Sequence, residues 1–145
     1  MALATVALLG FAAADESVKE LTGYRLRDTA INYHDFNLWV ITSEDAFSET
    51  FVPEHEAVTR PQFDTEMVLA AKVKTFSWSY KPRFKRVVPG KNELNVYFTV
   101  QKADSVKDGN DPLSLAVFPK SKAFRKVNFY HDHVLVKSVP IVSVY

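Results

Sequence analysis

Cysteine is absent from this chain of 145 residues, and glycine occurs only four times. Without cysteine there can be no disulfide framework, no thiolate nucleophile, no zinc–thiolate site and no lipid anchor on a cysteine side chain. The few glycines form no phosphate-binding loop. Packing of side chains must therefore hold the fold together.

Aromatic residues are plentiful instead, with 11 Phe, 6 Tyr and 2 Trp. Hydrophobic residues make up 47% of the chain and charged residues 24%, which is the usage of an ordinary globular domain. A chain of this length buries about two-thirds of its unfolded surface in one core. We therefore expect a single domain over residues 15–145, with a core rich in aromatic rings.

The formal net charge of +1 conceals opposite charges in the two parts of the chain. Residues 1–66 carry 4 basic and 12 acidic residues, a charge of −8, whereas residues 67–145 carry 14 basic and 5 acidic residues, a charge of +9. Either an acidic face lies beside a basic one, or strands from the two parts alternate and neutralise each other. Because strands distant in sequence are often neighbours in a sheet, the second arrangement is favoured.

The N-terminal residues 1–14 indicate a signal peptide. An uncharged apolar run, too short to cross a bilayer as a helix, ends in Ala12-Ala13-Ala14 before the polar Asp15, and small residues there suit signal peptidase. No basic residue precedes the run, so the signal is truncated or, alternatively, the run is a buried segment of the fold. The pattern favours a periplasmic or secreted protein whose mature chain begins near Asp15.

Seven segments have the alternation, or the β-branched and aromatic content, of strands. They are residues 36–41, 67–75, 84–88, 93–100, 113–117, 125–130 and 133–137. The continuous apolar run that begins at Met67 predicts a central strand buried on both faces. Pro89 and Gly90 predict a type II turn, and His131-Asp132 predicts a tight turn between the last two strands.

One short helix is predicted, with Thr42 as its N-cap, Asp45 at the third helical position and Pro53 as its end. Phe47 and Phe51 are four residues apart, so both rings should lie on one face of the helix and cover an open side of a sheet. Strands outnumber helices, and the fold class predicted is mainly β (α+β). We expect an antiparallel sheet curled into a barrel or sandwich of about seven strands, with one short helix near residues 43–51.

Residue sets that would indicate catalysis or metal binding are incomplete. His131 and His133 would share one side of a strand, but no third ligand has metal-site spacing. The oxygen-bearing residues in 104–111 lack the spacing of a calcium loop, and the two His-Asp pairs have no serine in a nucleophile turn. We therefore expect no catalytic residues, no metal and no cofactor.

The best candidate site is the segment 72–91, which holds seven basic residues, no acidic residue and several interleaved aromatic rings. Rings beside cations can bind a glycan or a polyanion through stacking and charge. The alternative, which is favoured, is that the rings belong to the core and the cations are solvated, and an exported protein is not expected to bind nucleic acid. The candidate ligand-binding residues are Lys72, Lys74, Trp78, Tyr80, Arg83, Lys85 and Arg86.

Five further stretches carry a family resemblance. They are LWVITSEDAFSETF (38–51), PQFDTEMVLAA (61–71), NELNVYFTV (92–100), PLSLAVFPK (112–120) and KVNFYHDHVLVKSV (126–139). In their order over about 100 of the 145 residues they resemble small exported bacterial proteins related to the C-terminal domain of the protease-complex subunit PrcB.

The resemblance implies an exported, non-enzymatic protein-binding domain that accompanies a protease or another protein. Members of that family often carry a lipid anchor, from which this chain departs because it has no cysteine. A glycan- or polyanion-binding domain that uses the segment 72–91 is the alternative function.

Overall fold

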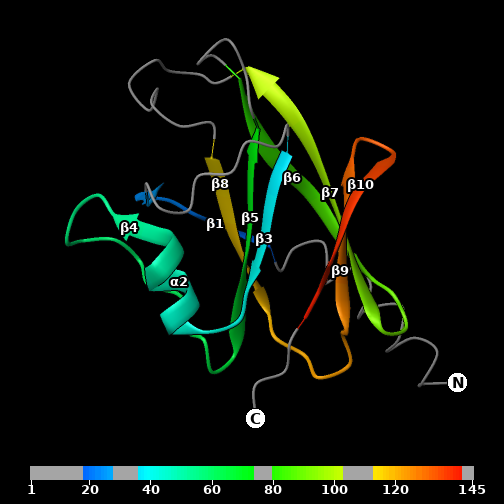
Figure 1. Cartoon of the computed structure of the whole chain (residues 1–145), viewed down its shortest axis with the longest axis horizontal. Coiled ribbons are helices and arrows are strands. Elements are labelled where there is room, and N and C mark those ends of the chain that lie inside the picture. The colour runs from blue at the N-terminus through cyan, green and yellow to red at the C-terminus, as the bar shows by residue number, and fades with distance from the viewer. Residues whose placement is uncertain (1–17, 28–35, 74–79, 103–112, 142–145) are drawn as a thin grey trace, which may run out of the picture.

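The computed structural model describes residues 18–27, 36–73, 80–102 and 113–141, which form ten strands and one helix (Figure 1). The seven longer strands are the seven predicted from the sequence, with ends shifted by a few residues. Three further strands have three residues each, too few for a detectable pattern. The predicted signal peptide lies outside the described residues.

The central sheet has the strand order β1 (Lys19–Leu21), β8 (Leu113–Pro119), β5 (Glu66–Val73) and β3 (Phe36–Ile41), and all of its pairs are antiparallel. Alternate residues of β5 serve two cores, since Val68 and Ala70 face one cluster while Met67, Leu69 and Ala71 face the other. The predicted central strand is thus confirmed as buried on both faces.

The outer sheet has the order β10 (Val134–Pro140), β9 (Lys126–His131), β7 (Glu93–Lys102) and β6 (Tyr80–Pro89). It packs against one face of the central sheet, so the fold is a sandwich rather than a closed barrel. Strands β7 and β9 pair in parallel, which is the exception among the described pairs to the predicted antiparallel arrangement. The cause is β8, which lies in the other sheet, so that the chain runs back through the central sheet before it returns as β9.

A cover layer closes the opposite face of the central sheet and consists of β2 (Tyr24–Leu26), α2 (Glu44–Thr50) and β4 (Phe51–Pro53) (Figure 1). The N-cap of α2 is Ser43, one residue later than predicted, because the Ser43 hydroxyl accepts a hydrogen bond from the Ala46 N–H at 3.2 Å. The helix ends at Thr50, before Pro53, because the chain turns extended at Phe51 and pairs with β2.

The rings of Phe47 and Phe51 are buried together between the cover layer and the central sheet, as predicted, with centroids 5.4 Å apart. They do not share a helix face, however, because Phe51 belongs to β4. Tyr24 stands edge-on to Phe47 at 5.0 Å, and Trp39 of β3 stands edge-on to Phe51 at 5.9 Å. Aromatic pairs of this geometry add to the stabilisation that burial of the rings supplies.

Two predicted turns are displaced. The β6–β7 hairpin exists, but the Gly90 N–H donates to the Glu93 carbonyl at 2.7 Å, which puts Lys91 and Asn92 at its tip. Gly90 does not have the positive φ that a type II turn would need. The β9–β10 turn lies one residue later than predicted, and there Asp132 adopts a φ of 55°.

The buried phenol of Tyr24 predicts an alkaline limit to stability. Burial raises the pKa of Tyr24 above its ordinary value of 10.0, although nearby Arg60 acts in the opposite direction, and the hydroxyl donates to the Thr59 carbonyl at 2.8 Å. As the pH rises, the Tyr24 hydroxyl therefore loses its proton at a lower pH in the unfolded chain than in the native protein. The contribution to stability is complete below a pH of 10.0 and is lost as the pH rises through the native pKa.

Urea unfolding on either side of that pH would measure the effect. The wild type should lose more stability on alkalinisation than the Tyr24→Phe variant, which has no proton to lose at this position. Equal losses in the two proteins would contradict the assignment.

Candidate functional site

The structure separates the residues predicted as a ligand-binding face. Lys72 is half-buried on β5 in the central sheet, whereas Tyr80 is exposed on β6 in the outer sheet, so the two do not share one strand. Lys74 and Trp78 lie outside the described residues. Arg83, Lys85 and Arg86 all lie exposed on β6, and this part of the predicted site is brought together.

The exposed face of the outer sheet carries a row of side chains that crosses all of its strands. Arg86 of β6 lies opposite Tyr97 of β7, Tyr97 lies opposite Tyr130 of β9, and Tyr130 lies opposite Leu135 of β10. We call these four residues the tyrosine row. The side chains at Val96, Phe98 and Phe129, which point the other way, are buried in the core between the sheets.

Contacts within the tyrosine row fix the orientation of its rings. The two tyrosine rings stack with centroids 4.8 Å apart and planes 15° from parallel. The guanidinium carbon of Arg86 lies 4.6 Å from the centroid of the Tyr97 ring, on the side of β6. Both faces of the Tyr97 ring are therefore occupied, by a cation on one side and a second ring on the other.

A polar network next to the row holds three strands in register. The Asn128 side chain is 5% exposed and donates to Asn95 Oδ1 at 3.1 Å and to Glu93 Oε2 at 3.1 Å. It accepts from the Ser138 hydroxyl at 2.7 Å. The amide of Asn128 thus joins β9 to β7 on one side and to β10 on the other. These hydrogen bonds support the register in which Tyr97 lies opposite Tyr130.

Three further cations lie on β6 beside Arg86 of the row, and we call Lys81, Arg83, Lys85 and Arg86 together the basic edge. In the described ranges β6 pairs only with β7, which makes it an edge strand. Its prolines Pro82 and Pro89 and the irregularity between Phe84 and Arg86 are devices that stop an edge strand from pairing with another chain. Charged side chains on an edge strand have the same effect, so part of the positive charge of β6 is explained without any ligand.

The opposite end of the row is apolar and accessible. Val134 and Leu135 at the start of β10 are 66% and 50% exposed. Together with Tyr80 they are the exposed large hydrophobic residues among the described part of the chain. A face with tyrosine rings and arginine beside exposed apolar side chains has residue types that are enriched at the centre of protein interfaces, namely tyrosine and arginine.

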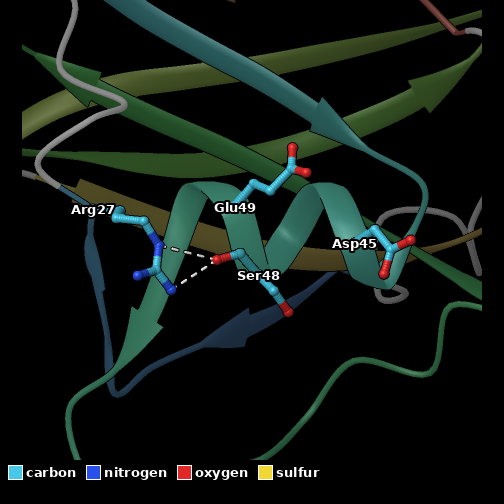
Figure 2. A pocket seen from close by; sticks show the side chains of 4 residues that line it. All are labelled: Arg27, Asp45, Ser48 and Glu49. Carbon is cyan, nitrogen blue, oxygen red and sulfur yellow. Dashed lines mark hydrogen bonds between the residues drawn. The ribbon is translucent and has the colours of Figure 1, made fainter.

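A shallow depression lies between the end of β2 and α2 and is lined by Arg27, Asp45, Ser48 and Glu49 (Figure 2). Arg27 Nε and Nη2 donate to the Ser48 carbonyl at 3.1 and 2.8 Å, and the Arg27 N–H donates to the Thr50 carbonyl at 2.8 Å. A cation at the carbonyl end of a helix satisfies its last acceptors. The side chains of Asp45, Ser48 and Glu49 point in different directions, so no polar groups converge there (Figure 2).

The histidines that were considered as metal ligands have other surroundings. The His131 ring stacks on Phe98 at 5.4 Å and lies 5.1 Å from the ring of Phe36, while Nε2 is 3.7 Å from Asp132 Oδ2. His133 lies exposed in the turn before β10. Within residues 18–27, 36–73, 80–102 and 113–141 no group of three or more potential ligands could hold a metal ion. The oxygen-bearing residues in 104–111 lie outside these ranges.

Comparisons with known proteins found no matching family model, no matching curated protein and no matching solved structure. The resemblance to the PrcB family therefore stays a prediction that rests on the five quoted stretches. In the described part of the chain no helix has the length and apolar character needed to cross a membrane.

Sequence reasoning found the basic edge but missed the tyrosine row. The alternation of residues 93–100 predicts Tyr97 on the face opposite to Leu94, Val96 and Phe98, and the structure agrees. Its partner Tyr130 comes from β9, which pairs with β7 across a crossover through the other sheet. No local pattern signals such a pairing.

Proposed function

We propose that this chain is an exported, non-enzymatic binding module that engages a partner protein through the exposed face of its outer sheet. The observation that carries the proposal is the tyrosine row, in which Arg86, Tyr97, Tyr130 and Leu135 cross all strands of that sheet. Rings and arginine held in place before binding lose little conformational entropy when a partner arrives. The basic edge beside the row favours a partner with an acidic surface.

The resemblance to the PrcB family supports one kind of partner. It implies a protein that accompanies a protease, so an exported protease is the first partner to test. The signal-like residues 1–14 support the same compartment, periplasmic or secreted.

A glycan or polyanion is the second candidate ligand, and the four cations of the basic edge favour it. Against it stands the geometry of Tyr97, because sugar and base stacking need a free ring face and both faces of this ring are occupied. Protein binding does not need a free ring face and is therefore favoured.

Site-specific photo-crosslinking in the native cell tests the proposal. A photoreactive phenylalanine analogue at Tyr130 should give a crosslinked product with a discrete protein, and the same analogue at Lys122, which is exposed on the β8–β9 connection, should not. The product should disappear when Arg83 and Arg86 are both replaced by glutamate, since those cations border the row. Crosslinking of equal strength from both positions, or from neither, would refute the proposal.

Heparin chromatography separates the second candidate from the first. If heparin binding involves the basic edge, the wild type should elute at a higher salt concentration than the Arg83→Glu, Arg86→Glu variant. That result, together with no protein crosslink at Tyr130, would favour the polyanion as the ligand.

A further inference from the structure

The charged side chains of this molecule are sorted by layer, although its strands are interleaved. The cover layer and the loop that follows it, residues 24–27 and 43–65, carry six carboxylates and three arginines, a formal charge of −3. The outer sheet with its turns, residues 80–102 and 125–140, carries nine basic and two acidic residues, a formal charge of +7. The two layers lie on opposite faces of the central sheet (Figure 1).

This arrangement corrects the expectation that the two parts of the chain would neutralise each other. Strands from both parts do share the central sheet, where β8 and β5 from the basic half lie between β1 and β3 from the acidic half. That sheet is buried on both faces and holds few charges, so the mixing has little electrostatic effect. The charges lie in the outer layers, and each of those comes mostly from one half of the chain.

The carboxylates of the cover layer are presented to solvent. Glu44, Asp45 and Glu49 are exposed on α2, and Glu54 and Glu56 are exposed in the turn after β4. One of the three arginines, Arg27, is already bonded to the carbonyl end of α2. We call these five carboxylates the acidic face.

We propose that a second copy of this chain is a partner of the tyrosine row, docked through its acidic face against the basic edge. The inference rests on the proposed function, since it uses the same binding surface of the outer sheet. Charge complementarity carries it: Arg83, Lys85 and Arg86 would face carboxylates of α2 and of the following turn. The copies do not repel each other overall, because the net charge of each is only +1.

The geometry determines what kind of assembly results. The two complementary surfaces differ and lie on opposite sides of the molecule, so the contact is head-to-tail and leaves one surface of each kind free at the ends. Copies would therefore add in series, to form chains or a closed ring, and not stop at a symmetric dimer. The exposed Val134 and Leu135 at the end of the row would supply the apolar area that charges alone do not provide.

Sedimentation velocity measures the association. At a low salt concentration of about 20 mM, the wild type should form species that grow with protein concentration, and at about 500 mM salt it should be a monomer, because surface charges are then screened within a few ångströms. A wild type that stays monomeric at low salt, or that associates equally at both salt concentrations, overturns the proposal.

Two near-isosteric variants test which surfaces meet. One carries Arg83→Gln and Arg86→Gln, and the other carries Glu44→Gln, Asp45→Asn and Glu49→Gln. Each alone should associate about tenfold more weakly, because each has lost the charges of one of the two surfaces that meet. In an equimolar mixture one intact surface of each kind remains, so the mixture should form a dimer and nothing larger.

The outcomes also separate this inference from the proposed function. If Tyr130 crosslinks to a different protein while the wild type stays monomeric, the binding surface stands and the second copy is refuted. If both variants associate as the wild type does, the contact lies elsewhere on the molecule. If heparin is needed for association, the basic edge serves a polyanion and the proposed pairing with the acidic face is wrong.

Discussion

Replacing Phe47 by alanine is expected to lower the free energy of unfolding by about 3–5 kcal/mol, the range for loss of a large buried ring. The Phe47 side chain is 6% exposed, and its ring lies within 5.6 Å, between centroids, of the rings of Tyr24, Phe51 and Phe63. These neighbours come from β2, from β4 and from the loop between β4 and β5, so the cavity cannot collapse without moving all three segments. Urea unfolding followed by circular dichroism would measure the loss.

The exposed Ser48 on the same helix provides the matched control. Ser48→Ala keeps the helix and removes no buried group, so its effect should stay within about 0.5 kcal/mol of the wild type. A small effect of Phe47→Ala, equal to that of Ser48→Ala, would mean that the helix does not pack on the central sheet.

Replacing Phe98 by alanine should also lower the free energy of unfolding by about 3–5 kcal/mol, in this case by disrupting the core between the central and outer sheets. The Phe98 side chain is 1% exposed between the two sheets, stands edge-on to Phe36 of β3 at 5.7 Å and stacks on His131 of β9 at 5.4 Å. Its removal would leave a cavity where the central and outer sheets meet. Phe98→Leu keeps most of the volume and should cost less than about 1.5 kcal/mol.

The two substitutions also differ in where their effects should spread. Phe98→Ala should speed amide hydrogen exchange in β7 and β9, which carry the tyrosine row, whereas Phe47→Ala should act first on α2 and β4. Equal exchange changes in both regions for both variants would show that the layers unfold as one unit.

Patterns within single strands were enough to predict most of the fold. Alternation along residues 93–100 predicts Leu94, Val96, Phe98 and Val100 on one face, and the first three are buried in the core while Val100 is half-buried. The unbroken apolar run from Met67 predicts β5 at the centre, because burial acts residue by residue along a strand. The helix was predicted within a residue of its start, although its N-cap is Ser43 and not Thr42, and Phe51, the second ring of the predicted helix face, belongs to β4.

Features that depend on distant segments were not predictable in this way. Strands β1, β2 and β4 are short and form because a neighbouring strand offers free backbone groups, as when β1 adds to the edge of β8. The turn after Pro89 moved because pairing of Glu93 with Gly90 outweighed the local preference of a Pro-Gly pair. The candidate site was the least predictable feature. A row of residues across four strands depends on the order of the strands in the sheet, and that order is determined by the whole chain.

The parallel pairing of β7 with β9 also has a consequence for how the chain folds. The β6–β7 and β9–β10 hairpins are each closed by short connections, so both can form early as local units. The two hairpins are joined through β8, which pairs with β5 in the central sheet. This pairing closes the long loop between β5 and β8 at an entropic cost. We expect that step to set the refolding rate, so a cut in the chain between β7 and β8 should slow refolding by about as much as it lowers the equilibrium constant for folding, and should leave the unfolding rate nearly unchanged.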